Sequence, residues 1–230
     1  MTIFCAIDTT DLALAEELAA TIGPVTGGLK LGLEFFNAHG PQGIAQVMAT
    51  CEDAALFLDL KFHDIPNTVA GAVRAVSETL KPAYLNVHAS GGTEMMKAAK
   101  DACATETKLL GVTILTSLSD IELGDIGYEG PAGTCVERLA HLAQQAGLDG
   151  VVCSAMEIEA LRKACGPDFI LMVPGIRPED SAADDQKRVM GPAQAINAGA
   201  THLVIGRPIT QADDPAQAAQ AILDEINDQS

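Results

Sequence analysis

The sequence predicts an α/β fold, a single-domain (β/α)8 barrel of the TIM type that spans residues 1–230. Two observations carry this prediction. Short aliphatic runs alternate eight times with longer, Ala-rich segments of helical periodicity. In addition, no Gly/Ser-rich linker and no shift in composition marks a second domain. Eight strand–helix units in 230 residues are typical of a closed barrel.

The first four units each pair an aliphatic run with a helical segment. Strands are expected where residues of high β-propensity cluster, in TIFCAID (2–8), GGLKLGL (27–33), AALFLDLKF (54–62) and AYLNVHA (83–89). The helical segments between them cover residues 10–21, 34–50, 66–80 and 92–104.

The last four units repeat the pattern. Strands are expected in KLLGVTIL (108–115), DGVVCS (149–154), FILMVPG (169–175) and THLVIG (201–206). Helices are expected at residues 131–146, 156–165, 191–199 and 213–227, and the last of these closes the chain.

An open, doubly wound sheet is the competing architecture. It would place a G-x-G-x-x-G turn directly after the first strand. The first strand instead runs into DTTD, and the glycine-rich stretches TGGLKLG and ASGG do not have that spacing. The barrel is therefore favoured.

The composition and the first residues of the sequence indicate where in the cell the protein is expected. Hydrophobic residues make up 48% of the chain, which is enough for a sizeable core. No apolar run approaches the length of a membrane span, which is about 18 residues. The start, MTIFCAIDTTD, lacks the basic segment of a secretory signal. We expect a soluble, cytoplasmic protein with no membrane partner.

The net charge of −17 excludes some partners. Nucleic acids and anionic membrane surfaces repel such a protein at long range, so neither is expected to bind it. A small anionic substrate remains possible, because a local cluster of Arg side chains and backbone N–H groups can reverse the field. The acidity itself is most simply explained by solubility.

The six cysteines are expected to be reduced and mostly buried. They are scattered, with no C-x-x-C pair and no histidine at zinc-like spacing. No metal site is therefore predicted.

The segment DLKFHDIPNT (59–68) places charges where a buried strand ends. Because side chains alternate along a strand, Phe57, Asp59 and Lys61 share one face of residues 54–62. The other face carries leucines that should meet the helices. In residues 27–33 the same reasoning directs Lys30 inward, while Leu29, Leu31 and Leu33 face the helices.

These inward charges are expected at the C-terminal mouth of the barrel, where active sites of this fold form. Asp8 lies just beyond the first strand and His88 near the end of the fourth. Buried lone charges are costly, so Lys30, Asp59 and Lys61, together with Asp64, require an alternating network. A purely structural network is the alternative interpretation.

The flanking acids should keep Lys61 protonated. At about 4 Å and an effective dielectric constant near 20, each carboxylate favours the ammonium form by about 4 kcal/mol before desolvation is subtracted. A charged lysine is a poor nucleophile and a good proton donor. The pattern therefore favours general acid catalysis over a Schiff base.

A phosphate site is predicted at the loops after the seventh and eighth strands. The loop VPGIRPEDSAADDQKRV (173–189) supplies Arg177 and Gln186, and VIGRPI (204–209) places Gly206 and Arg207 at the opening of a helix. These loops commonly bind phosphate in barrels, and arginine supplies suitable donors. The simpler alternative is that Arg207 is a surface residue. The long loop is also a candidate lid.

These motifs resemble the orotidine 5′-phosphate decarboxylase family over nearly the whole chain. The similarity rests on DLKFHDIPNT together with AIDT (6–9), LKLGLEFF (29–36), NVHASGG (86–92), TILTSL (113–118), VVCSAME (151–157), VPGIRP (173–178) and VIGRPI (204–209). No key position departs from the family pattern, whereas residues 119–136 are less distinctive.

The resemblance implies decarboxylation of orotidine 5′-phosphate to UMP without a metal or cofactor. Lys61 would protonate C6, Asp59 would lie beside the departing carboxylate, and Lys30 would contact Asp59 and the ribose. Asp64 and Thr68 would reach into the partner's site of a homodimer. The remaining substrate contacts implied by the resemblance are Asp8 at the ribose hydroxyls, Thr116 and Ser154 near the ribose or pyrimidine, and Arg177, Gln186, Gly206 and Arg207 at the phosphate.

Two alternatives remain at this stage. A related group of barrels uses a similar D-x-K-x-x-D arrangement with Mg²⁺ to decarboxylate or condense sugar-phosphate keto acids. FHDIPNT after the lysine and LKLGLEFF before it favour the orotidine enzyme. A non-catalytic binding protein on the same fold would retain nucleotide without turning it over.

Overall fold

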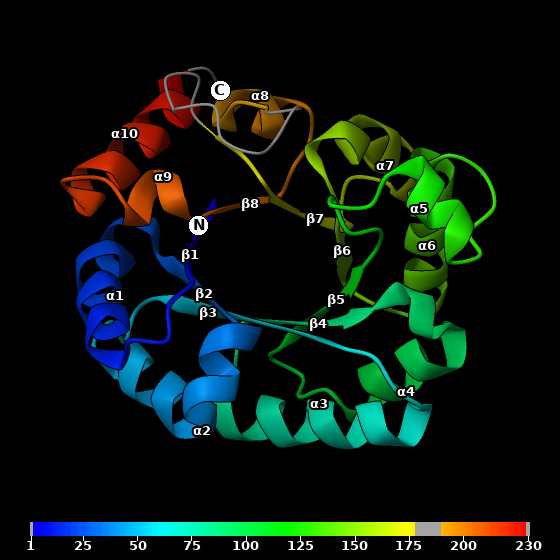
Figure 1. Ribbon diagram of the computed structural model, residues 1–230, viewed down its shortest axis with the longest axis horizontal. Helices are drawn as coiled ribbons and strands as arrows, with labels where there is room; N and C mark the ends of the chain where they lie inside the picture. The colour runs from blue at the N-terminus through cyan, green and yellow to red at the C-terminus, as the bar shows by residue number, and fades with distance from the viewer. Residues whose placement is uncertain (1, 178–189, 229–230) are drawn as a thin grey trace.

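The computed structural model describes residues 2–177 and 190–228. Its eight strands form a closed parallel barrel in the order β1 to β8, and β8 pairs back onto β1. Figure 1 looks into the barrel, with the strands around the centre and the helices outside them. The predicted (β/α)8 fold is confirmed.

The strands are short and match the eight predicted runs. They are β1 (Ile3–Ile7), β2 (Gly28–Gly32), β3 (Ala55–Phe62), β4 (Tyr84–His88), β5 (Lys108–Val112), β6 (Gly150–Val152), β7 (Ile170–Pro174) and β8 (His202–Ile205). Each lies inside the expected range.

Helices cover the outside of the barrel. They are α1 (Leu12–Thr26), α2 (Leu33–Ala49), α3 (Pro66–Leu80), α4 (Thr93–Ala102), α5 (Asp120–Asp125), α6 (Ala132–Gln145), α7 (Ile158–Cys165), α8 (Pro192–Asn197), α9 (Arg207–Thr210) and α10 (Pro215–Asp228). Two 3₁₀ turns, η1 (Ala89–Gly91) and η2 (Ala155–Glu157), follow β4 and β6.

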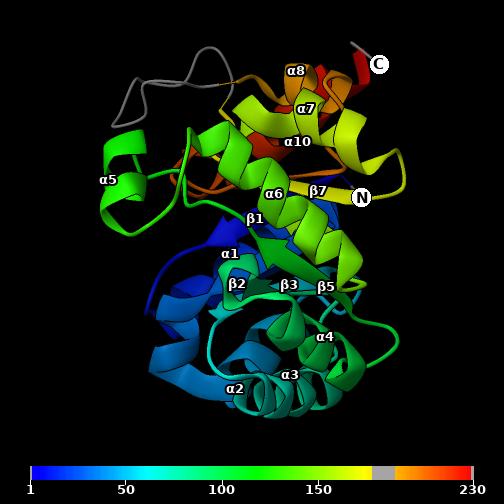
Figure 2. The same ribbon diagram turned by 90° about the vertical axis from the view of Figure 1, so that its right-hand side faces the viewer.

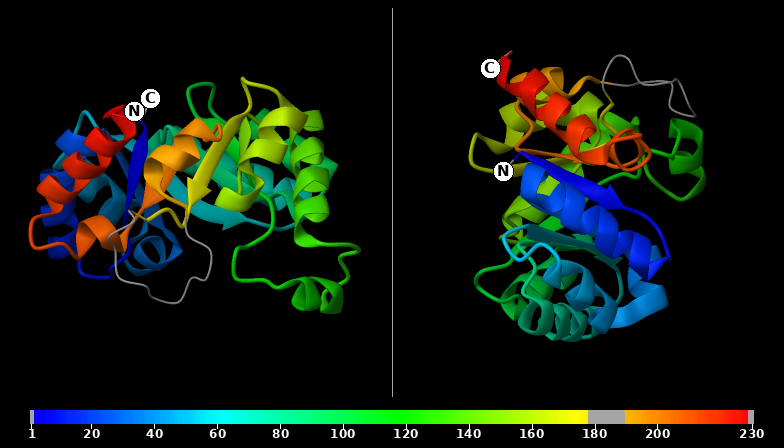
Figure 3. Two further views of the ribbon diagram at one scale, coloured as in Figure 1. Left: turned by 90° about the horizontal axis from the view of Figure 1, so that it is seen from above. Right: turned by 90° about the vertical axis from the view of Figure 1, so that its left-hand side faces the viewer.

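Two helices differ from the sequence prediction. Helix α1 runs five residues past its expected end at residue 21, because it stops only where Gly27 adopts a left-handed conformation (φ 67°) and its N–H donates to the Gly23 carbonyl. Helix α5 was not predicted. Its Ser119 and Glu122 form a reciprocal capping box that fixes its start. Helix α5 projects past the C-terminal ends of the strands (Figures 2 and 3).

The apolar side chains form two layers. The larger layer lies between strands and helices and includes Leu29, Leu31 and Leu58. The smaller layer fills the barrel interior with Phe4, Ala6, Phe57, Leu110, Met172 and Val204. Near the N-terminal ends of the strands, the interior also holds Tyr84, whose hydroxyl lies 2.8 Å from His202 Nε2. The alternation expected for β2 and β3 is thereby confirmed for the aliphatic residues within the strands.

Leu33 is an exception to that expectation. We predicted that it faces the helices together with Leu29 and Leu31, but it is 48% exposed. Strand β2 ends at Gly32, and Leu33 is already the first residue of α2, so the two-residue period no longer applies to it.

All six cysteines are free; five are buried and Cys103 is half-buried. Burial, with a smaller contribution from Asp8, raises the pKa of the Cys5 thiol to about 12. These residues therefore act as small apolar side chains, as predicted. Within the described residues, no helix is long and apolar enough to cross a membrane.

One arginine ties the N-terminal ends of β7 and β8 to α7. The Arg162 guanidinium donates to five oxygens, those of Gly166, Pro167, Phe169, Gly199 and the Thr201 hydroxyl. A lysine ammonium at this position could not reach partners so widely spread.

We therefore expect Arg162→Lys to lower the free energy of unfolding by roughly 3 kcal/mol, because several backbone carbonyls lose a charged donor. Urea denaturation measures this value. The exposed neighbour substitution Lys163→Ala serves as the control and should change it by less than about 0.5 kcal/mol. Equal changes in the free energy of unfolding for the two substitutions would show that the Arg162 hydrogen bonds do not stabilise the fold.

Candidate functional site

A cavity of about 320 Å³ opens at the C-terminal ends of the strands. Its apolar lining includes Ala6, Phe57 and Val204, which also belong to the apolar core of the barrel interior and form the floor of the cavity. The volume lies in the range of small-molecule sites, about 300–1,000 Å³. The packed barrel interior therefore gives the cavity a rigid apolar base.

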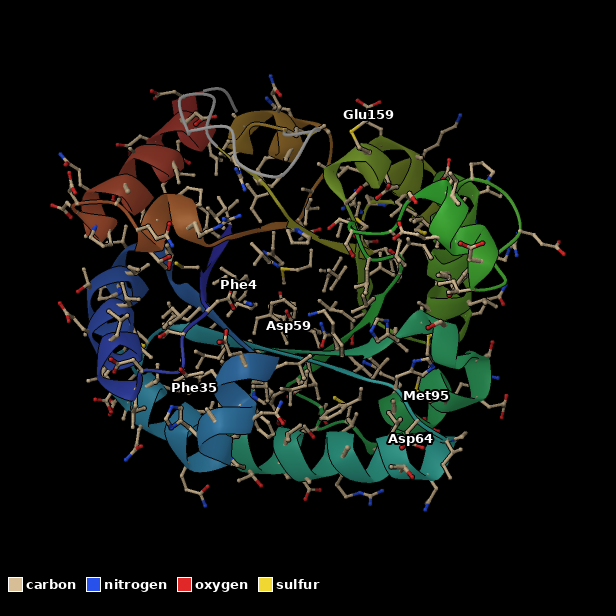
Figure 4. The ribbon with its side chains drawn as sticks, viewed as in Figure 1. Phe4, Phe35, Asp59, Asp64, Met95 and Glu159 are labelled. Atoms are coloured by element: carbon tan, nitrogen blue, oxygen red, sulfur yellow. The ribbon has the colours of Figure 1, made fainter. Side chains whose placement is uncertain are left out.

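One wall of the cavity carries a chain of alternating charges from β1, β2 and β3. Lys30 Nζ lies 2.7 Å from Asp8 Oδ1 and 3.8 Å from Asp59 Oδ2. Lys61 Nζ lies 2.6 Å from Asp59 Oδ1. Asp59 thus lies between two ammonium groups, and Figure 4 shows it at the centre of the barrel. The structure brings together four of the charges expected at the mouth, which are Asp8, Lys30, Asp59 and Lys61.

Asp59 remains a carboxylate despite its burial. Desolvation alone would raise its pKa, but the charges of Lys61 and Lys30, and hydrogen bonds from Lys61 and Asn86, hold the pKa below its ordinary value. The site therefore keeps a fixed negative charge at neutral pH. That charge is lost only as the pH falls through the lowered pKa.

The backbone of Lys61 departs from strand geometry. Its φ of 48° lies in the left-handed region, which costs a residue other than glycine about 1–2 kcal/mol. Between the pairs Leu58–Leu85 and Phe62–Val87, β3 advances four positions while β4 advances two. Lys61 therefore lies where the regular pairing of β3 with β4 is interrupted, two residues after Asp59.

Asn86 of β4 is a site residue to which we assigned no role from the sequence. It is fully buried and lies beside this irregularity. Its Oδ1 accepts from the Lys61 N–H at 2.7 Å, and its Nδ2 donates to Asp59 Oδ1 at 2.7 Å. The sequence did carry one signal for Asn86, because a polar side chain on the inward face of the strand AYLNVHA (83–89) indicates a role inside the barrel.

The loops after β5 to β8 supply the residues predicted for phosphate and for the ring. Arg177, Gly206 and Arg207 line the cavity after β7 and β8. Thr116 lines both this cavity and an adjoining recess of about 560 Å³, which Ser154 also lines. Gln186 lies outside the described residues.

The Ser154 side chain is oriented by Glu157 in the turn η2. Ser154 Oγ donates to Glu157 Oε2, which also accepts from the Ser154 N–H at 2.8 Å. The Met156 N–H in turn donates to Ser154 Oγ at 3.3 Å. With its proton committed to Glu157, the Ser154 hydroxyl is left to act toward the recess as an acceptor.

Asp64 and Thr68 are not brought to the cavity of their own chain. Both are exposed, and Asp64 Oδ1 accepts from the neighbouring Ile65 N–H. Asp64 takes part in no ion pair that the described residues form. In Figure 4 it lies to the side, near the ends of α3 and α4, away from Asp59. Within one chain, the predicted network therefore stops at Lys61.

His88, expected near the mouth, lies at the end of β4 beside the charge network. Its ring is 5.6 Å from that of His63. Burial lowers its pKa, and the nearby His63 and Lys61 lower it further, so the imidazole is neutral at neutral pH. It flanks the network but is not among the residues that line the cavity.

The cavity lining is basic although the protein is acidic. Four basic side chains, Lys30, Lys61, Arg177 and Arg207, face two acidic ones, Asp8 and Asp59. In the described ranges, no three His, Cys, Asp or Glu side chains gather as metal ligands would. The arrangement fits an anionic ligand with one charged group at each wall.

Comparison with known proteins agrees with this geometry. The chain matches the OMPdecase family, described as "Orotidine 5'-phosphate decarboxylase / HUMPS family", over residues 1–222. A relative from Rhodospirillum rubrum named orotidine 5′-phosphate decarboxylase is 54% identical, covering 97% of this chain and 93% of its own. One of the same name from Paramagnetospirillum magneticum is 50% identical, covering 97% of both chains.

A solved structure shows the same fold. The crystal structure of orotidine 5′-phosphate decarboxylase from Lactobacillus acidophilus superimposes with a TM-score of 0.86 at 35% identity, covering 98% of this chain and 99% of that one. Sequence similarity and three-dimensional similarity both extend over nearly the full length. The chain therefore belongs to the orotidine 5′-phosphate decarboxylase family.

Proposed function

We propose that this chain is one catalytic domain that decarboxylates orotidine 5′-phosphate to UMP, the last step of pyrimidine nucleotide synthesis, at the Asp59–Lys61 end of its cavity. Family membership makes the chain a carboxy-lyase. The observation that carries the placement of the chemistry is the Lys61 ammonium held 2.6 Å from a buried carboxylate.

Lys61 supplies both charge and a proton. Loss of CO2 leaves negative charge at C6 of the pyrimidine, and an adjacent ammonium attracts that charge more strongly as it develops. Lys61 then donates a proton to C6. Asp59 keeps the ammonium oriented, and its own charge faces the departing carboxylate of the substrate.

The loops after β7 and β8 bind the phosphate. Arg177 and Arg207 offer guanidinium donors, and Gly206 leaves room for an anion to approach the start of α9, with Gln186 assigned to the same group from the family pattern. Thr116 and Ser154 are placed near the ribose or pyrimidine, and Asp8 and Lys30 near the ribose. Binding energy from the phosphate then helps to hold C6 against Lys61.

The active unit is proposed to be a cytoplasmic homodimer with shared sites. Residues 63–68 form a continuous exposed stretch after β3, and Ile65 within it is 65% exposed. Leu33, 48% exposed at the start of α2, is a second large apolar side chain left open to solvent. A partner subunit that covered this surface would receive Asp64 and Thr68 beside its own Lys61.

The magnesium-dependent alternative is less favoured. The family description includes a second group, HUMPS, but relatives at 54% and 50% identity both carry the decarboxylase name.

Purified protein is expected to remove the absorbance of orotidine 5′-phosphate and to form UMP, with the same rate after treatment with EDTA. The chelator control separates this reaction from Mg²⁺-dependent sugar-phosphate chemistry. Retention of nucleotide without turnover would identify a binding protein instead.

Lys61→Ala should lower kcat by at least about 1,000-fold while UMP still binds, because both the charge and the proton at C6 are lost. Lys61→Arg is the matched variant. It keeps a cation but not a proton donor of suitable acidity, and it should remain strongly impaired. Near-normal turnover of Lys61→Ala would refute the assigned role.

Mixing inactive Asp64→Ala with inactive Lys61→Ala should restore roughly one quarter of the wild-type activity, since half of the randomly formed dimers are hybrids with one intact site. The matched control mixes Asp59→Ala with Lys61→Ala. Both of these residues belong to one subunit's site, so no activity should return. If subunits exchange and Asp64→Ala is still not complemented, Asp64 acts within its own chain.

A further inference from the structure

Asn86 is a buried polar residue at the centre of the charge network that lines no cavity. It is fully buried, lies on the inward row of β4 between Tyr84 and His88, and is absent from the cavity lining. It therefore has no direct route to a substrate. Its two hydrogen bonds instead go to the two residues that the proposed chemistry uses most.

The first hydrogen bond satisfies a backbone group that the sheet cannot satisfy. Where β3 carries two more residues than β4, the regular parallel ladder is interrupted, and Lys61 has a φ of 48°. A buried N–H at such a place needs a partner. The Asn86 Oδ1 atom, 2.7 Å from the Lys61 N–H, provides it.

The second hydrogen bond closes a ring. Asn86 Nδ2 donates to Asp59 Oδ1 at 2.7 Å, and the same oxygen accepts from Lys61 Nζ at 2.6 Å. The path runs from the Lys61 backbone through Asn86 and Asp59 to the end of the Lys61 side chain. Both ends of the long and flexible Lys61 residue are thus linked to Asn86, directly at the backbone N–H and through Asp59 at Nζ.

We propose that Asn86 is a positioning residue that holds Lys61 in its left-handed conformation and orients the Asp59 carboxylate, so that the ammonium is in place before substrate binds. This inference rests on the proposed function and adds a residue to it. An apolar side chain of the same size would fill the space but would leave the Lys61 N–H without a partner and Asp59 with one donor fewer.

A merely structural role predicts a different result from a positioning role. Loss of packing would lower the unfolding temperature without altering the turnover of the molecules that remain folded. Loss of position would lower kcat while ground-state affinity, measured with UMP, changes little, because Asn86 does not line the cavity.

Asn86→Leu is therefore expected to lower kcat by about 100-fold, with the Kd of UMP changed less than about 3-fold. Tyr84→Phe is the matched control. It removes a hydrogen bond from the same inward row of β4, to His202 in the barrel interior, and should lower the unfolding temperature without this loss of kcat. Equal kcat values for the two variants would overturn the proposal.

Asn86→Asp tests the two hydrogen bonds separately. The new side chain keeps the acceptor for the Lys61 N–H but donates to Asp59 only while it is protonated. Its protonation depends on the charged and titratable groups around it, which are Asp8, Lys30, Asp59, Lys61 and His88. The adjacent Asp59 carboxylate disfavours its ionisation, so protonation and partial rescue should increase as the pH falls.

The kcat ratio of Asn86→Asp to Asn86→Leu should thus rise toward acidic pH, and a ratio independent of pH would contradict the proposal. Should Asn86→Leu fail to fold, the ratio of Asn86→Asp to wild type gives the same decision.

The wild-type rate separates a failure of the proposed function from a failure of the role proposed for Asn86, because an inactive wild type refutes only the proposed function. A crystal structure of a folded variant decides the inference without any turnover, since an unchanged Lys61 conformation in Asn86→Leu would refute it.

Discussion

The site depends on one interaction, the pairing of the buried Asp59 carboxylate with two ammonium groups. A carboxylate in this position would be neutralised if it stood alone, because burial disfavours its charged form. The charges of Lys61 and Lys30 reverse that outcome and hold its pKa below the ordinary value. In return, Asp59 lies 3.8 Å from Lys30 Nζ and 2.6 Å from Lys61 Nζ, so one carboxylate orients both ammonium groups.

The barrel makes this network possible because neighbouring strands end at one mouth. Asp8 follows β1, Lys30 lies on β2, Asp59 and Lys61 on β3, and Asn86 on β4. Neighbouring strands thus supply all four charges of the network, and β4 adds the neutral amide that bonds two residues of it. Arg177 and Arg207 follow β7 and β8, and β8 pairs with β1, so the closed barrel brings the two arginines to the same cavity as the charge network.

Much of this arrangement was predictable from the residue pattern. The two-residue period of strands placed Lys30 and Asp59 inside, and the order of strands placed the arginines at the mouth. The same period failed for Leu33, because the strand had already ended. It also put the polar Asn86 on the inward row of β4, but the hydrogen bonds of Asn86 depend on an irregularity between β3 and β4 that a two-residue period cannot express. Helix α5 did have a local signal, the capping pair Ser119 and Glu122. Asp64 is exposed and lies away from the cavity of its own chain, and its proposed role in a partner's site cannot be read from the strand pattern of one chain.

The acidic composition and the basic cavity are compatible because charge acts over a limited range. At physiological ionic strength, interactions between exposed charges are largely screened beyond about 8 Å. The net charge of −17 is spread over the whole chain, whereas four basic side chains converge on a cavity of about 320 Å³. An anion at the mouth therefore experiences mainly the groups that line it. Because the cavity floor is apolar and of low polarisability, those few charges act there with more strength than the many at the surface.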